Sequence, residues 1–505
     1  MDSFLLYADK NLSGETPYPS FQDIYKDLNL NIILKTMAQD DIFMMEQIRN
    51  VMMVPIKNRE GLLYRYEIVR DFYENPDLSE KLYTSAKAGF RLAEQYKKEM
   101  EQNRGKSTAK TSGIISSLNF ITDSLSLLKT VRDILCQDNL DLKSNGLCCL
   151  RERLCRYPLE EFSEFHNQLL FYTTGGEGIF PIHLSGGLKL ERSCLERCRN
   201  THGLTLKGTS KKLLKLYYKV IKKDTILIEN ETLKKDIQTF VETNMKCVVD
   251  TYQPFLNDCI KFFFDFSREV AFYRGIYNMQ RRMKELSLPL CYGSVSEDNK
   301  QRKIKDLYEL SLALYTQTYP VPNSITSEKT VLTVITGANQ GGKSTFLRSF
   351  GIAQVMMQCG MPVPAEDFCS GLYSRIHTHF TRKEDAMLSR GRLEEELKRM
   401  SSIISQLSSD SLLLLNESFA STTEKEGSQI AYNVIVPLYR KGISVMMVTH
   451  LHEFARKIYE EELPQAEFLV AERKENGERT FHMLPGKPHY SSYGTDLYEY
   501  MIGKL

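Results

Sequence analysis

The residues with the clearest chemistry form a glycine-rich segment, Gly337-Ala-Asn-Gln-Gly-Gly-Lys343-Ser344, which fits G-x-x-x-x-G-K-[ST] at every fixed position. In such a segment, backbone N–H groups surround phosphate oxygens, the lysine reaches the β- and γ-phosphates, and the hydroxyl binds Mg²⁺. We therefore predict a nucleotide site made of consecutive residues. They are Gly337, Ala338, Asn339, Gln340, Gly341, Gly342, Lys343, Ser344 and Thr345.

The flanking residues supply the elements that such a loop requires. Val331 to Ile335 are apolar or β-branched and predict a buried strand, and Thr345 to Gln358 predict a helix. This order brings the positive potential of the helix N-terminus close to the phosphates. A chance glycine turn is the alternative, and it is the weaker interpretation because strand and helix are both in place.

A second apolar run, Leu412 to Leu415, ends in Asn416 and Glu417. In a P-loop ATPase the first of these positions is usually an Asp that holds Mg²⁺ through water, and the second is a Glu that polarises the attacking water. We therefore assign Mg²⁺ to Ser344, Asn416 and Glu417, and the role of general base to Glu417. Because Asn416 removes one negative charge beside the metal, hydrolysis is expected to be slow.

A third apolar run, Val445 to Val448, is followed by Thr449 and His450. At the carboxyl edge of a parallel sheet, His450 would reach the γ-phosphate or the attacking water. A purely structural histidine is the alternative. We assign His450 to catalysis together with Glu417.

Ser389-Arg390-Gly391 precedes a helix expected near Leu393 to Leu407. Ser and Gly at a helix start are suited to binding phosphate from outside. We expect Ser389 and Gly391 to complete the nucleotide site of a second subunit, with a plain helix cap as the alternative.

The segment from Ser210 to Asp224 separates into an apolar and a basic face and lies in a region, 189 to 228, that the pattern predicts to be helical. Its basic face contains Lys212, Lys215, Lys219 and Lys222. We assign these lysines to DNA phosphates, which they would contact without reading sequence. A solvated helix face is the equally weighted alternative.

Composition limits the classes of function. Lys+Arg is 66 and Asp+Glu is 64, so any nucleic-acid contact must come from local basic patches. No apolar run approaches the roughly 18 residues of a membrane span, and the start of the chain has no cationic signal region. A cytoplasmic protein is expected, nucleoid-associated when bound to DNA. The first 286 residues read as mainly helical, with a polar joint at 102–113, and strands alternate with helices from Tyr292 onward.

These motifs, in this order and spacing, resemble those of the MutS family. The resemblance is carried by TGANQGGKSTFLRSFG, Met361 to Glu366, Ser374-Arg-Ile376, Leu415-Asn-Glu417 with Gly427, Thr449-His450, and Ser492-Tyr-Gly494. It covers about Tyr292 to Leu505, and it is specific because the Val-Pro-Ala-Glu and Ser-Tyr-Gly segments are not general ATPase features. The preceding helices resemble the family's core, lever and clamp domains more weakly.

The resemblance implies an α/β plus all-α fold, in which an ABC-type P-loop ATPase domain follows a long helical region. The implied domains are a core-like region at 1–110, a lever- and clamp-like region at 111–260, a return to the core at 261–291, and the ATPase domain at 292–505. It implies ATP and Mg²⁺ as cofactors, DNA as a partner, whether duplex or branched, and a homodimer through the ATPase domain.

The sequence departs from the family pattern in three respects. The chain has no room for the mismatch-reading and connector domains, and it ends soon after Ser-Tyr-Gly. The family's Arg-Gly-Thr-Ser-Thr run is replaced by Ala420-Ser-Thr-Thr423-Glu424. The family's adenine-packing Phe-Val-Pro-Asn is Pro320-Val-Pro-Asn323 here, so we expect that role to pass to Tyr319.

The leading hypothesis is an ATP-dependent DNA-binding protein that clamps on DNA in mismatch repair or recombination-related transactions. The alternative is a nucleotide-switched scaffold that binds protein or RNA through its helical region. A third possibility is an ATP-binding dimer that hydrolyses ATP poorly.

Overall fold

The computed structural model describes most of the chain. The described residues are 3–8, 17–103, 109–138, 140–164, 166, 178–179, 182–184, 190–193, 197–198, 231–381, 391–474 and 478–488. They belong to two compact units, and several long helices run from one unit into the other. One unit comprises Lys87–Asp133 and Arg153–Phe264, and the other comprises Ser3–Ala86, Ile134–Glu152 and Asp265–Leu505.

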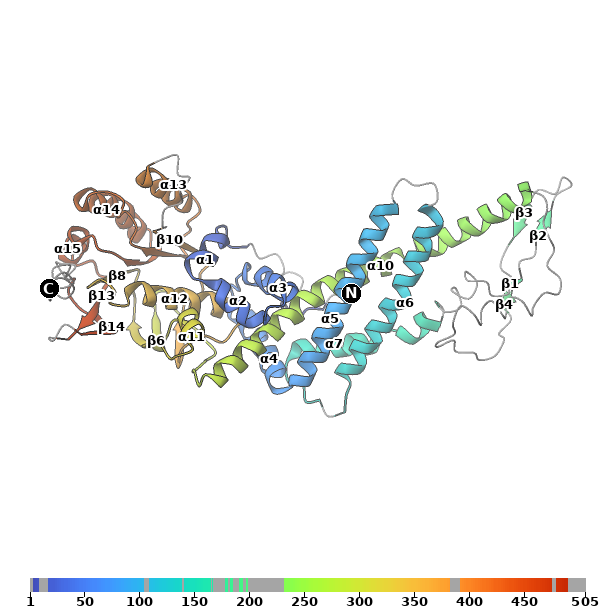
Figure 1. The fold of residues 1–505 in the computed structure, drawn as a ribbon, viewed down its shortest axis with the longest axis horizontal. Coiled ribbons are helices and arrows are strands. Elements are labelled where there is room, and N and C mark those ends of the chain that lie inside the picture. Colours follow the sequence, from blue (N-terminus) through green and yellow to red (C-terminus); the bar gives the residue numbers. More distant parts are fainter. Residues whose placement is uncertain are drawn as a thin grey trace, which may run out of the picture. The chain divides into compact units, whose positions relative to one another are not determined.

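The first part of the chain is helical, as its apolar spacing predicts (Figure 1). Its helices are α1 (Phe21–Asp27), α2 (Leu30–Ala38), α3 (Ile42–Met52), α4 (Arg59–Glu74), α5 (Pro76–Asn103), α6 (Ala109–Leu135), α7 (Asn145–Arg156) and α10 (Glu231–Glu285). Helix α4 ends before Asn75, and Pro76 opens α5, in keeping with the preference of proline for the first position of a helix. Helix α10 nevertheless continues through Pro254 for 55 residues.

Two local expectations were wrong. The polar joint predicted at 102–113 is shorter, since α6 already begins at Ala109. In the region 189–228, predicted to be helical, the described residues form two short strands, β3 (Leu190–Ser193) and β4 (Arg197–Cys198). They pair with β2 (Ile182–Leu184) and β1 (Gly178–Ile179), respectively, which precede this region. The preceding glycines favour turns over a continuous helix.

The unit that contains most of α6 has an aromatic core between helices. Tyr96 stacks on Phe120 with ring centroids 4.4 Å apart, and Phe90 meets Phe264 edge to face. A Cβ on Gly89 would lie 2.5 Å from the Phe263 ring, so the absence of a side chain there allows close approach of α5 and α10. These contacts pack the helices side by side within this unit.

The other unit contains a six-stranded sheet in the order β10-β11-β12-β8-β13-β14. Its strands are β8 (Leu332–Thr336), β10 (Arg375–Phe380), β11 (Ser411–Asn416), β12 (Ser444–Val448), β13 (Ala466–Arg473) and β14 (Arg479–Pro485). All neighbours are parallel except β13 and β14, which pair antiparallel at one edge of the sheet. Every residue of β8 and β12 is buried, as expected for strands covered on both faces.

Helices cover both faces of this sheet (Figure 1). They are α12 (Lys343–Gln358), α13 (Arg392–Ile404), α14 (Glu424–Arg440) and α15 (His452–Glu460). Helices α13, α14 and α15 share one hydrophobic core with β8, β11 and β12. Helix α12 lies on the opposite face, where a Cβ on Gly351 would lie 2.8 Å from both Leu28 and Leu414. The helix after the P-loop is therefore packed between the sheet and the N-terminal helical region.

A second, four-stranded sheet lies beside the first and was not predicted. It has the order β5-β9-β6-β7 and comprises β5 (Ser294–Val295), β6 (Arg302–Leu307), β7 (Asn323–Ser327) and β9 (Asp367–Ser370), with α11 (Leu310–Thr316) between β6 and β7. Strand β6 reads Arg-Lys-Ile-Lys-Asp-Leu, and its charged residues conceal the alternation of buried and exposed positions.

Candidate functional site

The P-loop lies between β8 and α12, as predicted. Gly337 and Gly342 have φ values of +125° and +88°, which side chains rarely tolerate. A Cβ on Gly337 would also lie 2.9 Å from the Ala471 Cβ atom on β13. The two glycines therefore allow the loop to turn tightly against the sheet and direct the backbone toward a phosphate group.

Lys343 is folded back into its own loop. Its Nζ atom donates to the carbonyl oxygens of Gly337 at 2.9 Å and Ala338 at 2.7 Å. Burial lowers the pKa of Lys343 to about 8, although the nearby Glu417 carboxylate opposes this shift. An anion in the loop would replace these carbonyl contacts and restore the charged form, since opposite charge favours ionisation.

The carboxyl ends of β11 and β12 meet the P-loop edge. His450 Nε2 lies 3.4 Å from Glu417 Oε1, and this contact is the main reason why the pKa of Glu417 is below its usual range. The backbone N–H of Glu417 donates to the Val448 carbonyl at 2.9 Å, which fixes the start of the loop after β11. Glu417 and His450 line the same cavity as Lys343 and Ser344, so these predicted residues lie together.

The residues assigned to Mg²⁺ have suitable donor atoms. Asn416 Oδ1 is buried and has no hydrogen-bond partner among the described residues. Ser344 and Glu417 line the cavity, whereas Asn416 is not among the described residues that line it. Hydroxyl, amide and carboxylate oxygens are ligands that Mg²⁺ accepts, and Ser344, Asn416 and Glu417 are the residues that would hold the ion. A bound Mg²⁺ would neutralise charge on the phosphates.

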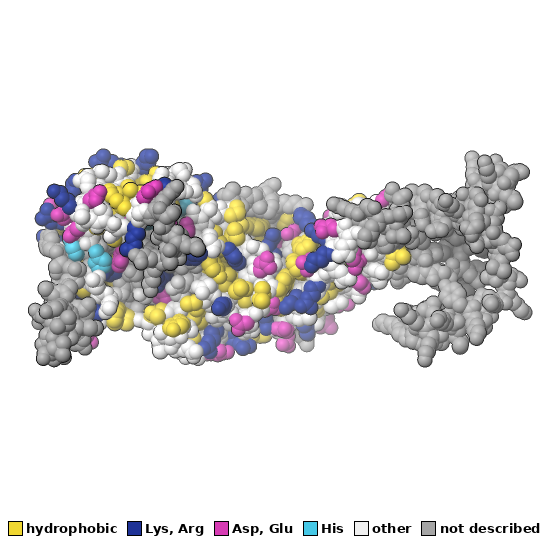
Figure 2. Space-filling model, turned by 45° about the horizontal axis from the view of Figure 1, so that its top comes forward, with side chains coloured by type: hydrophobic (Ala, Val, Ile, Leu, Met, Phe, Trp, Pro, Cys, Tyr) yellow, Lys and Arg dark blue, Asp and Glu magenta, His cyan; other side chains and the backbone are white. Residues whose placement is uncertain are grey.

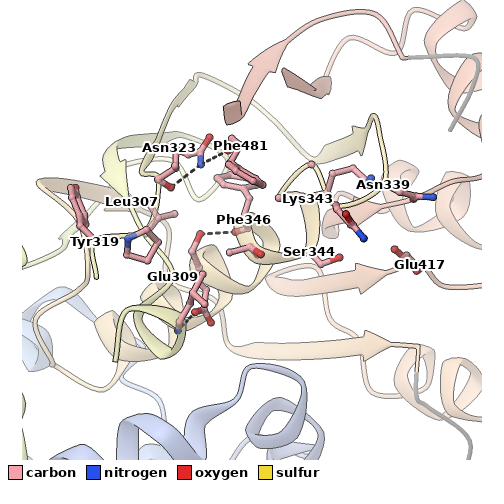
Figure 3. A pocket seen from close by; sticks show the side chains of 18 of the residues that line it. Leu307, Glu309, Tyr319, Asn323, Asn339, Lys343, Ser344, Phe346, Glu417 and Phe481 are labelled. Carbon is pink, nitrogen blue, oxygen red and sulfur yellow. Dashed lines mark hydrogen bonds between the residues drawn. The ribbon is translucent and has the colours of Figure 1, made fainter. Parts of the chain in front are cut away.

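A cavity of about 460 Å³ extends from the P-loop to an apolar end. Figure 3 shows Lys343, Ser344 and Glu417 at one end, Tyr319 and Leu307 at the other, and Phe481 between them. The Asn323 side chain fixes the position of Phe481 by donating to its carbonyl at 3.2 Å and accepting from the Met483 N–H at 2.7 Å. This end of the cavity is suited to a flat aromatic base.

Sequence reasoning missed Phe481. It lies on β14 in a strand without a local motif, and only the pairing of β14 with β13 brings it over the P-loop. A Cβ on Gly342 would lie 3.4 Å from the Phe481 Cβ atom. Tyr319, the expected base-packing residue, also lines the cavity but packs edge to face on Tyr308, with ring centroids 5.2 Å apart.

Gly391 is the one remaining predicted residue that the structure describes, and it is not among the residues that line this cavity. Gly391 is exposed at the start of α13, and no atom of the described residues, its chain neighbours aside, lies within 4 Å of the position where its Cβ would be. Ser389 and the four lysines Lys212, Lys215, Lys219 and Lys222 lie outside the described residues. Their roles stay predictions.

A glycine-rich loop between a buried parallel strand and a helix, with carboxylate and imidazole groups at the ends of the neighbouring strands, defines a P-loop ATPase domain of the ABC type. Residues 333–501 match the family model for MutS domain V, and residues 57–286 match the MutS2 N-terminal domain. The two matches together cover most of the sequence. The chain belongs to the MutS family.

Several curated proteins are similar to part of the chain. The "DNA mismatch repair protein MutS" of Thermotoga maritima is 32% identical over 167 residues, which are 32% of this chain and 21% of that protein. The protein of the same name from Syntrophomonas wolfei is 33% identical over 34% of this chain and 21% of its own length. The protein of the same name from Bacillus velezensis is 25% identical over 43% of this chain and 27% of its own length. The chain thus spans about a fifth to a quarter of the curated relatives that it matches.

Within the part of the chain that the structure describes, no helix is long and apolar enough to cross a membrane.

Proposed function

We propose that this protein is an ATP-dependent DNA-binding protein in which ATP binding and hydrolysis are coupled to clamping on DNA, in mismatch repair or recombination-related transactions. Two subunits would associate through the ATPase domain, with Ser389 and Gly391 of one completing the site of the other. The helical region would comprise a core at 1–110 and 261–291 and a lever and clamp at 111–260. The match of residues 57–286 to the MutS2 N-terminal domain supports this assignment.

The observation that carries the proposal is the bonding between the P-loop helix and the N-terminal helices. At the end of α12, the Gln358 carbonyl accepts from the Ile56 N–H at 2.6 Å, and the Gln358 side chain donates to the Ile56 carbonyl at 3.3 Å. The buried Arg65 of α4 donates to the Cys359 carbonyl at 2.9 Å. A movement of α12 on nucleotide binding would therefore be passed to α4 and the loop before it.

A second link acts through α1. The Asp27 carbonyl at the end of α1 accepts from Arg348 Nε of α12 at 3.2 Å, and the Asp27 carboxylate lies 3.9 Å from Arg399 Nη2 of α13. Asp27 thus contacts both the P-loop helix and the helix that begins at Gly391. The helical region is bonded to both sides of the proposed nucleotide site, which supports coupling between ATP and whatever the helices bind.

The test compares ATP turnover and DNA binding with homoduplex, mismatched and four-way-junction DNA, each with and without ATP. We expect branched DNA to bind more tightly than homoduplex and to change turnover. Lys343→Ala is the matched control, because it removes the phosphate contact without touching the helical region. If no DNA of any structure changes turnover or association of subunits, the scaffold alternative replaces this proposal.

The basic helix face needs its own test. Each lysine that contacts a phosphate releases counterions, so changing Lys212, Lys215, Lys219 and Lys222 to Glu should reduce the slope of log affinity against log salt by about 3 or more. We expect ATP turnover without DNA to stay unchanged. An unaltered salt slope would show that these lysines form a solvated surface.

Overall charge agrees with local rather than global contacts. On the face shown in Figure 2, the described basic and acidic side chains are interspersed, in keeping with 66 basic and 64 acidic residues. DNA contact would therefore depend on confined basic patches.

A further inference from the structure

The loop that follows β11 contains an unusual backbone. Glu417 and Phe419 have φ values of +56° and +66°, so two non-glycine residues on either side of Ser418 adopt the left-handed conformation. Such residues are strained and persist only where the surrounding structure holds them. The first of them carries the carboxylate that faces the P-loop.

Glu396 of α13 holds the far end of this loop. The backbone N–H of Phe419 donates to Glu396 Oε1. The Glu396 side chain is 8% exposed, and the Phe419 ring is fully buried. A hydrogen bond to a carboxylate is roughly twice as strong as one between neutral groups, so this contact is well suited to hold a strained amide.

His379 of β10 holds the middle of the loop. Its Nε2 atom lies 3.2 Å from the Glu396 carbonyl oxygen, and its Nδ1 atom lies 2.7 Å from the Ser418 hydroxyl oxygen. The Ser418 hydroxyl also donates to the His379 backbone carbonyl at 2.9 Å. The His379 ring also stacks on the Phe419 ring at 24°, with centroids 6.2 Å apart. The side chains involved are all buried, and none of them lines the cavity. They are Glu396, Phe419, His379 and Ser418.

The remaining sides of the loop are closed as well. The Thr381 hydroxyl donates to the Glu417 carbonyl at 2.8 Å. A Cβ on Gly427 would lie 2.4 Å from the Phe419 carbonyl oxygen, so only glycine leaves room for the loop in this conformation. The loop is therefore fixed by β10, α13 and α14 together.

We propose that Glu396 and His379 are positioning residues for ATP hydrolysis: they hold the Ser418–Phe419 backbone so that the Glu417 carboxylate faces the γ-phosphate site. This inference rests on the proposed ATP hydrolysis. It also assigns a task to α13, because this helix, whose N-cap is Gly391, is bonded through Glu396 to the amide two residues after the general base. A contact made at Gly391 would be transmitted to Glu417 by this route.

The experiment uses Glu396→Ala, Glu396→Gln and His379→Phe in the full chain, with Glu394→Ala as the control. Glu394 is exposed on the same helix and pairs with Lys398. Gln keeps an oxygen that accepts from Phe419, and Phe keeps the stacking but removes both hydrogen bonds. Three quantities are measured: kcat, the ATP dissociation constant, and hydrogen exchange of the amides at 417–420.

We expect Glu396→Ala to lower kcat by roughly ten- to a hundredfold, since a displacement of about 1 Å at a reacting group has effects of this size. ATP affinity should be unchanged, because the P-loop is intact. Exchange at 417–420 should accelerate while β11 and β12 keep their protection. Glu396→Gln should retain most of the wild-type kcat. The kcat of His379→Phe should lie between those of Glu396→Ala and Glu396→Gln, and the kcat of Glu394→Ala should equal that of the wild type.

The proposal is overturned by wild-type turnover in Glu396→Ala, by a Gln variant as impaired as the Ala variant, or by a loss of protection that extends through β11 and β12. Absence of turnover in the wild-type protein would instead contradict the proposed hydrolysis. Even then, the exchange at 417–420 would decide whether Glu396 holds the loop.

Discussion

The Nε2 atom of His450 lies 3.4 Å from the Oε1 atom of Glu417, at the carboxyl ends of two neighbouring parallel strands. This contact is the largest cause of the lowered pKa of Glu417. A carboxyl group whose pKa is lowered in the folded state contributes stability above its usual pKa, and that contribution is lost as the pH falls. The same shift keeps Glu417 ionised, and so able to act as a base, at mildly acidic pH.

The first prediction concerns this pair. Glu417→Gln should lower kcat by about a hundredfold or more, because a general base contributes a factor of that order. His450→Ala should raise the pKa of Glu417, so the acidic limb of the pH profile of kcat should move to higher pH. Turnover measured between pH 4 and 8 at roughly 0.1 M salt, where the Debye length is about 10 Å, checks both effects.

His452→Ala is the matched control, since His452 lies two residues further and is not among the described residues that line the cavity. It should leave the profile in place. A profile that does not move in His450→Ala would show that the imidazole has no influence on the base.

The second prediction follows from Lys343, whose pKa is lowered to about 8 by burial. Burial penalises the ammonium, so its charged form is lost as the pH rises through this value. Phosphate binding should restore the charge, so ATP binding at pH 8.5 should take up most of one proton, and this uptake should fall toward zero at pH 7. Calorimetry in buffers of different ionisation enthalpy measures this uptake.

Lys343→Arg supplies the comparison, because a guanidinium stays charged at every accessible pH. The binding that this variant retains should proceed without proton uptake at pH 8.5. Equal uptake in both proteins would assign the proton to another group.

The ATPase domain could be predicted closely from the sequence, since its signals are local. The helix at Glu424–Arg440 and the strands at Ser411–Asn416 and Ser444–Val448 lie where their apolar runs place them. The four-stranded sheet could not be predicted in this way, because its pairings join β5 and β6 to β9, more than 60 residues later. The charged residues of β6 also conceal the periodicity of that strand.

The same distinction applies to the site. The P-loop and Glu417 follow from consecutive residues, whereas Phe481, Glu396 and His379 acquire their positions only through tertiary contacts. Positive φ at Glu417 and Phe419 was also invisible in the sequence, since neither is glycine or asparagine. Sequence motifs therefore identify the residues that would react with ATP, whereas the residues that position them can be identified only from tertiary contacts.

The third prediction concerns the metal. Asn416→Asp adds a negative charge where the Asn416 Oδ1 atom is buried without a partner among the described residues. Without Mg²⁺ the variant should melt at a lower temperature than the wild type, because an unpaired buried charge is unfavourable. Mg²⁺ with ADP should raise its melting temperature more than that of the wild type, and should do so at lower Mg²⁺ concentration.

Asn433→Asp is a suitable control, since Asn433 lies on α14, is not among the residues that line the cavity, and pairs with Gln429 on the surface. It should show no Mg²⁺-dependent difference. If Asn416→Asp also showed no Mg²⁺-dependent difference in melting temperature, Asn416 would not be a ligand of the metal.

The last prediction separates two candidates for packing on adenine. Phe481 is 44% exposed beside the P-loop, and Asn323 holds its backbone, while Tyr319 packs against Tyr308 at the far end of the cavity. Because stacking of a base on an aromatic ring is worth about 1–3 kcal/mol, Phe481→Ala should weaken ATP binding by roughly tenfold or more. Tyr319→Ala should have the smaller effect, and Leu484→Ala, an exposed change on the same strand as Phe481, should have none. Inorganic tripolyphosphate, which has no base, should bind with the same affinity to the wild type and to the three variants. If Phe481→Ala lost affinity for tripolyphosphate as well as for ATP, the ring would support the P-loop and would not bind the base.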